Sequence, residues 1–161
     1  MSLVTRQYIP ADKPAFIALN RDWIEESFTV EQSDTDQLEG LEKTILGQGG
    51  QVIVAELDGQ IVGTGAILPP HHNPQDGKKW LEIVKMAAQK ELRGRGIGRA
   101  VLEALISEGR AMGANAIWLE TNNDLKAAIR LYERCGFQHL TEDALWPTPY
   151  ARCNVQMVLM L

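Results

Sequence analysis

A glycine- and arginine-rich run limits the possible folds of this chain more than any other segment. The run reads Arg93-Gly94-Arg95-Gly96-Ile97-Gly98 and is followed by Arg99. It lies between an apolar stretch at residues 80–88 and a stripe of apolar residues at helical spacing that extends to about residue 112. Because glycine allows a close backbone approach and a helix N-terminus attracts anions, the run predicts a strand, a phosphate-binding turn and a helix.

Two familiar nucleotide-binding motifs do not fit this run. A P-loop ends in Gly-Lys followed by Ser or Thr, and the glycines here are not followed by those residues. A dinucleotide fingerprint that begins at Gly94 needs a small residue at position 99, which is Arg in this chain. Two interpretations remain, namely a different phosphate-binding pattern formed by Arg93, Gly96 and Gly98, or a glycine-rich helix start that binds nothing.

Hydrophobic periodicity predicts the other elements. Alternating or continuously apolar stretches indicate strands, and apolar residues three or four positions apart indicate helices. Asp58-Gly59 is typical of a two-residue hairpin turn between two such strands. We expect strands at residues 3–9, 51–56, 60–68, 80–88, 115–120, 137–140 and 154–161, and helices at residues 12–27, 34–46, from the glycine run to 112, and at 125–135.

The order of these elements is β-α-α-β-β-β-α-β-α-β-β, which predicts an α/β fold of the α+β kind with one mixed sheet. A chain of 161 residues has the length of one domain, so we expect a single domain over residues 1–161.

Charge and composition exclude several classes of protein. The net charge of −5 argues against a nucleic-acid-binding module, although the arginine cluster in the run keeps that class as a third hypothesis. The sequence contains no apolar stretch of the length that a membrane helix needs and no apolar signal core near its start, which predicts a cytoplasmic protein without a membrane partner. Cys135 and Cys153 are too few for a disulfide scaffold and lack metal-ligand spacing, so we expect free thiols and no metal site.

A second motif lies downstream of the glycine run. Residues 128–137 read Ala-Ile-Arg-Leu-Tyr-Glu-Arg-Cys-Gly-Phe, which matches the pattern A-x-x-L-Y-E-x-x-G-F. Together with Arg93, Gly96 and Gly98 in the pattern R/Q-x-x-G-x-G/A, it makes the chain resemble the GNAT N-acetyltransferase superfamily over most of its length. The resemblance implies a GNAT-like acyl-CoA N-acyltransferase fold and transfer of an acetyl group from acetyl-CoA directly to a primary amine.

The resemblance also implies where acetyl-CoA binds. The pantetheine arm is expected along the end of the strand at residues 80–88, and the pyrophosphate on the amides of the glycine run. The expected cofactor-binding residues are Met86, Ala87, Ala88, Arg93, Gly94, Arg95, Gly96, Ile97, Gly98, Arg99 and Asn122. Asn122 is included because many family members have Asn where this chain has Leu125, although Asn122 and Asn123 can also serve simply as turn residues.

Two residues match the family's proton-transfer groups. Tyr132 lies in the second motif and is expected to be the general acid, although its place on an apolar helix stripe also suits a packing role. Glu82 stands six residues before Ala88, a spacing that resembles the catalytic Glu of the family's histone acetyltransferases, and is expected to be the base. A carboxylate in an apolar strand needs water or a partner, so Glu82 can instead pair with Lys85 or lie at the surface.

The acceptor site is less clearly marked. Trp23 and Phe28 lie in the region of the first two helices, where the family determines its acceptor, and Tyr150 and Arg152 form a Tyr-x-Arg element similar to one in bacterial members of unassigned substrate. We expect these four residues to bind a small-molecule, amino-acid or peptide amine, in a protein that can form a homodimer. The alternative from another class is a non-catalytic module that senses acyl-CoA.

Overall fold

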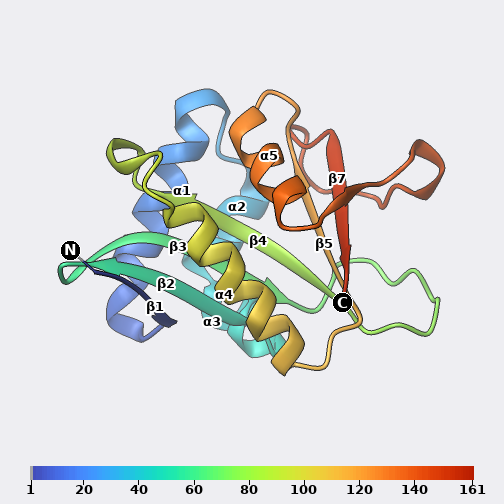
Figure 1. Cartoon of the computed structure of the whole chain (residues 1–161), viewed down its shortest axis with the longest axis horizontal. Coiled ribbons are helices and arrows are strands. Elements are labelled where there is room, and N and C mark those ends of the chain that lie inside the picture. Colours follow the sequence, from blue (N-terminus) through green and yellow to red (C-terminus); the bar gives the residue numbers. More distant parts are fainter. Residues whose placement is uncertain (1) are drawn as a thin grey trace.

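The computed structural model describes residues 2–161 and confirms the predicted mixed α/β architecture (Figure 1). The strands are β1 (Leu3–Gln7), β2 (Gln51–Leu57), β3 (Gln60–Leu68), β4 (Trp80–Ala88), β5 (Ala116–Thr121), β6 (Gln138–His139) and β7 (Val155–Met160). The helices are α1 (Lys13–Ser27), α2 (Gln32–Glu39), α3 (Leu41–Thr44), α4 (Ile97–Ala111) and α5 (Lys126–Arg134). Within this described part, the helices are all too short or too polar to cross a membrane.

The strands form one seven-stranded sheet in the order β1-β2-β3-β4-β5-β7-β6. The pair β4–β5 is parallel, whereas the other neighbouring strands run antiparallel. A parallel pair needs a crossover connection, and α4 provides it. This crossover brings the start of α4 close to the end of β4, where the sequence predicts the phosphate-binding turn.

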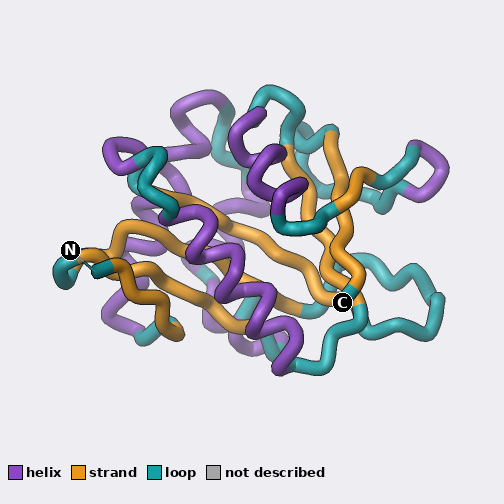
Figure 2. The backbone as a smooth tube through the Cα atoms, viewed as in Figure 1, coloured by secondary structure: helices purple, strands orange, loops and turns teal. Residues whose placement is uncertain are grey.

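Helices cover both faces of the sheet, and the strand pattern explains why. Successive side chains of a strand point to opposite faces, and Val52, Ile53, Val54 and Ala55 of β2 are all at most 4% exposed. One face packs against α1, α2 and α3 around a core that includes Phe16. The other face packs against α4 and α5, and Figure 2 shows α4 crossing the strands on that side.

The position of α4 is fixed by two glycines of β3. A Cβ atom at Gly63 would lie 2.6 Å from Ile97 Cγ2, and one at Gly65 would lie 2.7 Å from Leu105 Cδ1. Larger residues at either position would push the helix away from the sheet. The close packing therefore holds the first turn of α4 beside β3 and β4.

The predicted hairpin turn is confirmed. Asp58 has a φ of 51° and Gly59 a φ of 81°, as a two-residue turn between twisted strands requires.

The single helix predicted over residues 34–46 is wrong, because the chain breaks it at Gly40. The Gly40 amide donates to Asp36 O at 3.0 Å, which ends α2, and the Gly40 carbonyl accepts from Thr44 N at 2.9 Å, which begins α3. The apolar stripe continues through the break, since Leu38 and Leu41 are both fully buried. Burial of the stripe is therefore kept while the backbone turns at the residue with the lowest helix propensity nearby.

Candidate active site

The two strands of the parallel pair separate halfway along their length. The register of β4 and β5 runs from Trp80 and Ala116 to Glu82 and Trp118, and beyond this point β4 pairs with β3 and β5 with β7. A cavity of about 240 Å³ lies between the diverging ends. It is lined by residues from both strands and from α1, α5 and the segment that precedes β7.

A bulge in β4 accompanies the separation. The register between β3 and β4 shifts between Thr64 and Ala66, so that Lys85 and Met86 together face one residue of β3. Lys85 has a φ of 56°, in a region that side-chain-bearing residues seldom adopt. Such a bulge increases the local bend of a strand, which here turns the end of β4 away from β5.

The glycine run forms an open anion site at the start of α4. Gly94 and Gly96 have φ values of 83° and 78°, and a Cβ atom at either would meet nothing within 4 Å. The Gly96 carbonyl accepts from Ala100 N at 3.0 Å, which closes the first turn. The preceding amides of Ile97, Gly98 and Arg99 therefore lie at the unpaired, positive end of the helix, and they fit a phosphate or pyrophosphate.

Two arginine side chains of the run, unlike its backbone amides, are already paired with carboxylates. Arg93 lines the cavity but is paired with Glu26 at 2.8 Å, and Arg99 is paired with Glu103 at 2.7 Å. All four side chains are at least 36% exposed, so a phosphate can displace these pairs at small cost.

Tyr132 reaches the cavity from α5 and is 9% exposed. Burial raises the pKa of its phenol to about 12, so the hydroxyl is protonated at neutral pH. Its closest hydrogen-bond partner is Met86 Sδ at 4.0 Å, a weak acceptor. The hydroxyl is therefore able to donate its proton to a ligand in the cavity.

Glu82 lines the same cavity from β4, but His71 already occupies one of its oxygens. Glu82 Oε1 accepts from His71 Nδ1 at 2.6 Å and from the His71 backbone amide at 3.1 Å. The other ring nitrogen, Nε2, lies 2.5 Å from Pro147 O. Because both neighbours of the ring are acceptors, His71 donates from both nitrogens and is an imidazolium. The hydrogen bond to Glu82 raises the pKa of His71 to about 9, which agrees with this geometry.

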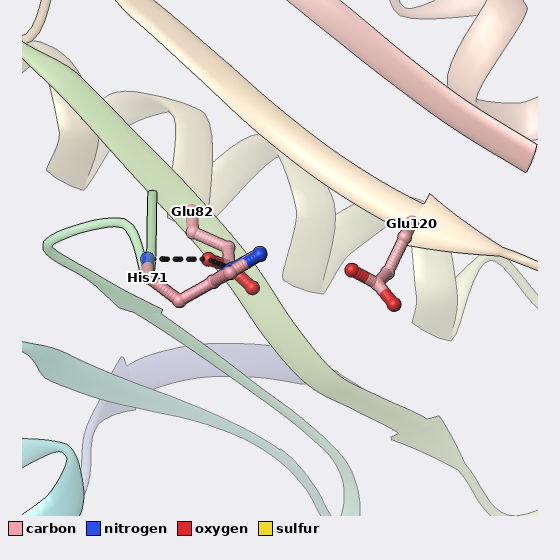
Figure 3. A group of neighbouring side chains, drawn as sticks. All are labelled: His71, Glu82 and Glu120. Atoms are coloured by element: carbon pink, nitrogen blue, oxygen red, sulfur yellow. Dashed lines mark hydrogen bonds and ion pairs between the residues drawn. The ribbon is translucent and has the colours of Figure 1, made fainter. Parts of the chain in front are cut away.

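Glu120 on β5 is a site residue that the sequence reasoning missed. Figure 3 shows its carboxylate pointing toward the Glu82–His71 pair, and the nearest ligating atoms of these three residues all lie within 4.8 Å of one another. Glu120 Oε1 accepts from the Thr148 hydroxyl, whereas Oε2 is buried and has no hydrogen-bond partner among residues 2–161. Burial raises the pKa of Glu120. In the sequence, the only sign that Glu120 could be a site residue was its position at the end of an apolar strand.

These three residues resemble a metal-ligand set in composition only. A metal ion needs a ring nitrogen with a free lone pair, and both nitrogens of His71 donate to oxygens. The cluster therefore suits proton transfer better than metal binding.

A buried ion cluster, the Asp34 cluster, lies beside the cavity and consists of Asp34, Lys85, Arg152 and Glu31. Asp34 accepts two hydrogen bonds of 2.7 Å from Arg152 and one of 2.6 Å from Lys85 Nζ, and Glu31 Oε2 accepts from Arg152 at 3.3 Å. Burial opposes ionisation of Asp34, but the hydrogen bonds from Arg152 and Lys85 outweigh it and lower its pKa to about 2.

The structure brings most of the predicted residues together. The predicted residues that line the cavity are Trp23, Phe28, Glu82, Met86, Ala87, Ala88, Arg93, Asn122, Tyr132, Tyr150 and Arg152. Residues 94–99 lie outside its lining, at the start of α4. Asn122 differs from the expectation in one respect, because its amide nitrogen donates to Arg152 O at 2.6 Å and its oxygen accepts from Asp124 N at 2.8 Å. The Asn122 side chain thus holds the loop as well as lining the cavity.

Comparison with known proteins gives a consistent result. Residues 17–137 match the model of the acetyltransferase (GNAT) family. The uncharacterised N-acetyltransferase YjgM of Escherichia coli is 30% identical over 98% of this chain and 94% of its own length. N-acetyltransferase family 8 member 2 of Rattus norvegicus is 35% identical over 63% of this chain, which spans 44% of that relative's length.

Solved structures share the fold. An acetyltransferase of the GNAT family from Staphylococcus aureus superposes with a TM-score of 0.84 at 21% identity, covering 99% of both chains. The structure of yncA from Salmonella typhimurium, a putative acetyltransferase with its cofactor acetyl-CoA, has a TM-score of 0.77 at 20% identity and covers 99% of this chain and 94% of its own.

Proposed function

Because the chain belongs to the acetyltransferase (GNAT) family, we propose that it transfers the acetyl group of acetyl-CoA directly to a primary amine within a ternary complex. Family membership makes it an acyltransferase that uses acetyl-CoA. The observation that carries the finer proposal is one cavity lined by both a protonated phenol and a carboxylate with one oxygen, Glu120 Oε2, that has no hydrogen-bond partner among residues 2–161. A cytoplasmic location and a homodimer remain predictions.

The residues present fit acetyl-CoA. The gap between β4 and β5 is open along residues 83–88, where the pantetheine arm is proposed to lie, and leads past Arg93 toward the amides of α4. These amides and the open space around Gly94 and Gly96 are proposed to hold the pyrophosphate. When bound there, acetyl-CoA supplies an acetyl group already activated as a thioester.

Direct transfer requires the protein to move two protons. A C–N bond forms as the C–S bond breaks, one proton leaves the attacking amine, and one is needed by the departing thiolate. Tyr132 is proposed to give the second proton, because it lines the cavity and, among residues 2–161, its buried hydroxyl has a hydrogen-bond contact only with Met86 Sδ. The alternative packing role of Tyr132 predicts no effect of removing the hydroxyl on the rate.

Two carboxylates are candidates for the base. Glu82 was predicted from its spacing and lines the cavity, but its Oε1 is held by His71. Glu120 Oε2 is buried and unpartnered in the described chain, so it has a free lone pair to accept a proton. Its raised pKa also brings Glu120 closer to the working range of a base. We therefore favour Glu120 as the group that receives the amine proton, with Glu82 as the second candidate.

Thiol release from acetyl-CoA tests the proposal. Release that rises above the acceptor-free background when polyamines, amino acids, aminoglycosides or short peptides are added is the expected result. Tight binding of acetyl-CoA in calorimetry without release on any amine would instead identify a non-catalytic acyl-CoA sensor. Glu120→Gln and Glu82→Gln then assign the base, since the variant that lacks it should lose about 100-fold in kcat.

A further inference from the structure

The cations that line the cavity are already paired with carboxylates. Lys85 Nζ lies 2.6 Å from Asp34 Oδ1, and Arg152 makes two 2.7 Å bonds to the same carboxylate. The third lining cation, Arg93, contacts Glu26 at 2.8 Å and lies at the cofactor end. Lys85 and Arg152 have side chains that are only 4% and 10% exposed, so a ligand carboxylate that approached either one from the cavity would compete with Asp34 for the same cation.

An adjoining cavity offers no further cation. It shares Glu82 and Tyr150 with the first cavity, and its other lining residues come from α2, α3, Gln48, residues 68–71 and Pro149. Among the described residues that line it, none is Lys or Arg, and its single His, His71, uses both ring nitrogens in existing contacts. An amine that extends through both cavities therefore meets no free positive group.

Negative charge is in excess around the acceptor end. Four carboxylates, those of Glu31, Asp34, Glu82 and Glu120, lie among three cations, which are Lys85, Arg152 and the imidazolium of His71. The excess falls on Glu120, whose Oε2 has no partner among residues 2–161. The ammonium group of a ligand is attracted to this point, whereas a carboxylate on the same ligand would be repelled by the carboxylates of the protein.

The remaining walls are aromatic and apolar. Trp23 and Phe28 pack edge to face with ring centroids 6.4 Å apart, and Tyr150 is held by hydrogen bonds from Lys85 and to Gln37. All three aromatic residues line the cavity. Such surfaces favour an apolar body next to the ammonium group.

From these observations we infer that the acceptor is an amine with an apolar or aromatic body and no carboxylate beside its amino group. The inference rests on the proposed transferase function and narrows it. Two sources share this chemistry, namely a free small amine and the N-terminus of a peptide, whose neighbouring carbonyl group is uncharged. Free α-amino acids are excluded, because their carboxylate would lie among four others.

The inference is tested with matched acceptors that differ only in whether the carbon next to the amino group carries hydrogen, an amide or a carboxylate. The test set contains phenethylamine, L-phenylalaninamide and L-phenylalanine, together with the corresponding tryptamine, leucine and alanine sets. The expected result is a kcat/KM at least tenfold higher for a member without a carboxylate than for the corresponding amino acid. The ratio of kcat/KM for the simple amine to kcat/KM for the amide distinguishes a free small amine from a peptide N-terminus as the acceptor.

A variant links any preference to the Asp34 cluster. Glu31→Gln removes one negative charge next to Arg152 and leaves a side chain of the same size in place. It should lower severalfold the ratio of kcat/KM for a carboxylate-free acceptor to kcat/KM for the corresponding amino acid. Glu39→Gln is the matched control, since Glu39 is 58% exposed, pairs with Arg21 and ends the same helix, α2.

Three results decide the matter. Amino acids that are acetylated as fast as their amides would overturn the acceptor class while leaving the transferase intact. Acetyl-CoA binding with no turnover of any set would also overturn it, because the sets sample the proposed class. Failure to bind acetyl-CoA would instead contradict the proposed function.

Discussion

Loss of the Asp34 carboxylate is expected to be among the most damaging single changes in this protein. Asp34 is fully buried and accepts four hydrogen bonds, two from Arg152, one from Lys85 and one from the Glu31 amide. Asp34→Ala leaves two cations facing each other with almost no access to water. Removing one partner of a buried ion pair costs about 3–5 kcal/mol, a large fraction of the roughly 5–15 kcal/mol that stabilises a domain.

The assay is urea unfolding followed by tryptophan fluorescence, with thermal unfolding as a second measurement. We expect the free energy of unfolding to fall by about 4 kcal/mol at unchanged m-value, and the melting temperature to fall by on the order of 10 °C. Asp36→Ala is the control on the same helix. Asp36 is exposed, and among residues 2–161 its carboxylate accepts a hydrogen bond only from Gln32, at 2.8 Å, so loss of this side chain should change stability by less than about 0.5 kcal/mol.

The pH dependence gives an independent check on Asp34. Its folded-state pKa of about 2 lies below the ordinary value of 3.8, so its contribution is complete above pH 4 and is lost as the pH falls through 2. This shift corresponds to about 2 kcal/mol, and Asp34→Asn should remove that part of the acid dependence. A loss below about 1 kcal/mol at neutral pH, or an unchanged acid limb, would show that water or a neighbouring carboxylate compensates the two cations.

Three further variants test other parts of the site. Tyr132→Phe should lower kcat about 100-fold with little change in acetyl-CoA affinity, and an unchanged kcat in steady-state assays would remove Tyr132 as the acid. Gly96→Glu should abolish acetyl-CoA binding in calorimetry, whereas Gly59→Glu, which shares a positive φ at an open turn, should bind normally; retained binding in Gly96→Glu would refute the pyrophosphate site. The raised pKa of His71, about 9, implies that its bond to Glu82 contributes fully below pH 6.5 and is lost as the pH rises through 9. The His71 side chain is 30% exposed, so the fall in unfolding free energy should be only about 1 kcal/mol and should be missing in His71→Gln.

The sequence was sufficient for most elements because their signals are local. Asp58-Gly59 marked the turn between β2 and β3, and so placed the two strands that flank it. The break at Gly40 was missed because the apolar stripe of α2 and α3 continues in phase across it. Periodicity records which face is buried, and it is insensitive to a backbone turn that preserves that face.

The site was only partly predictable, for a related reason. Tyr132 and the glycine run lie in contiguous motifs, whereas Asp34 meets Arg152 across 118 positions and Glu82 meets His71 from a loop. A lone Asp in a helix and a lone Glu at the end of β5 carry no local sign of their partners. Tertiary contacts alone distinguish the carboxylate of Glu120, whose Oε2 lacks a hydrogen-bond partner among residues 2–161, from that of Asp34, which accepts four hydrogen bonds.

The bulge at Lys85 connects the cofactor cleft to the acceptor site. A residue other than glycine at a φ of 56° costs about 1–2 kcal/mol, so something in the fold must compensate for it. The bulge bends β4 away from β5, which opens the cleft, and at the same position the Lys85 side chain reaches Asp34 at 2.6 Å. The ion pair thus stabilises the backbone conformation that opens the cleft. The same ion pair also neutralises Lys85, which lines the proposed acceptor site. Under the proposed function, one local irregularity in β4 therefore both makes room for acetyl-CoA and removes a binding partner for an acceptor carboxylate.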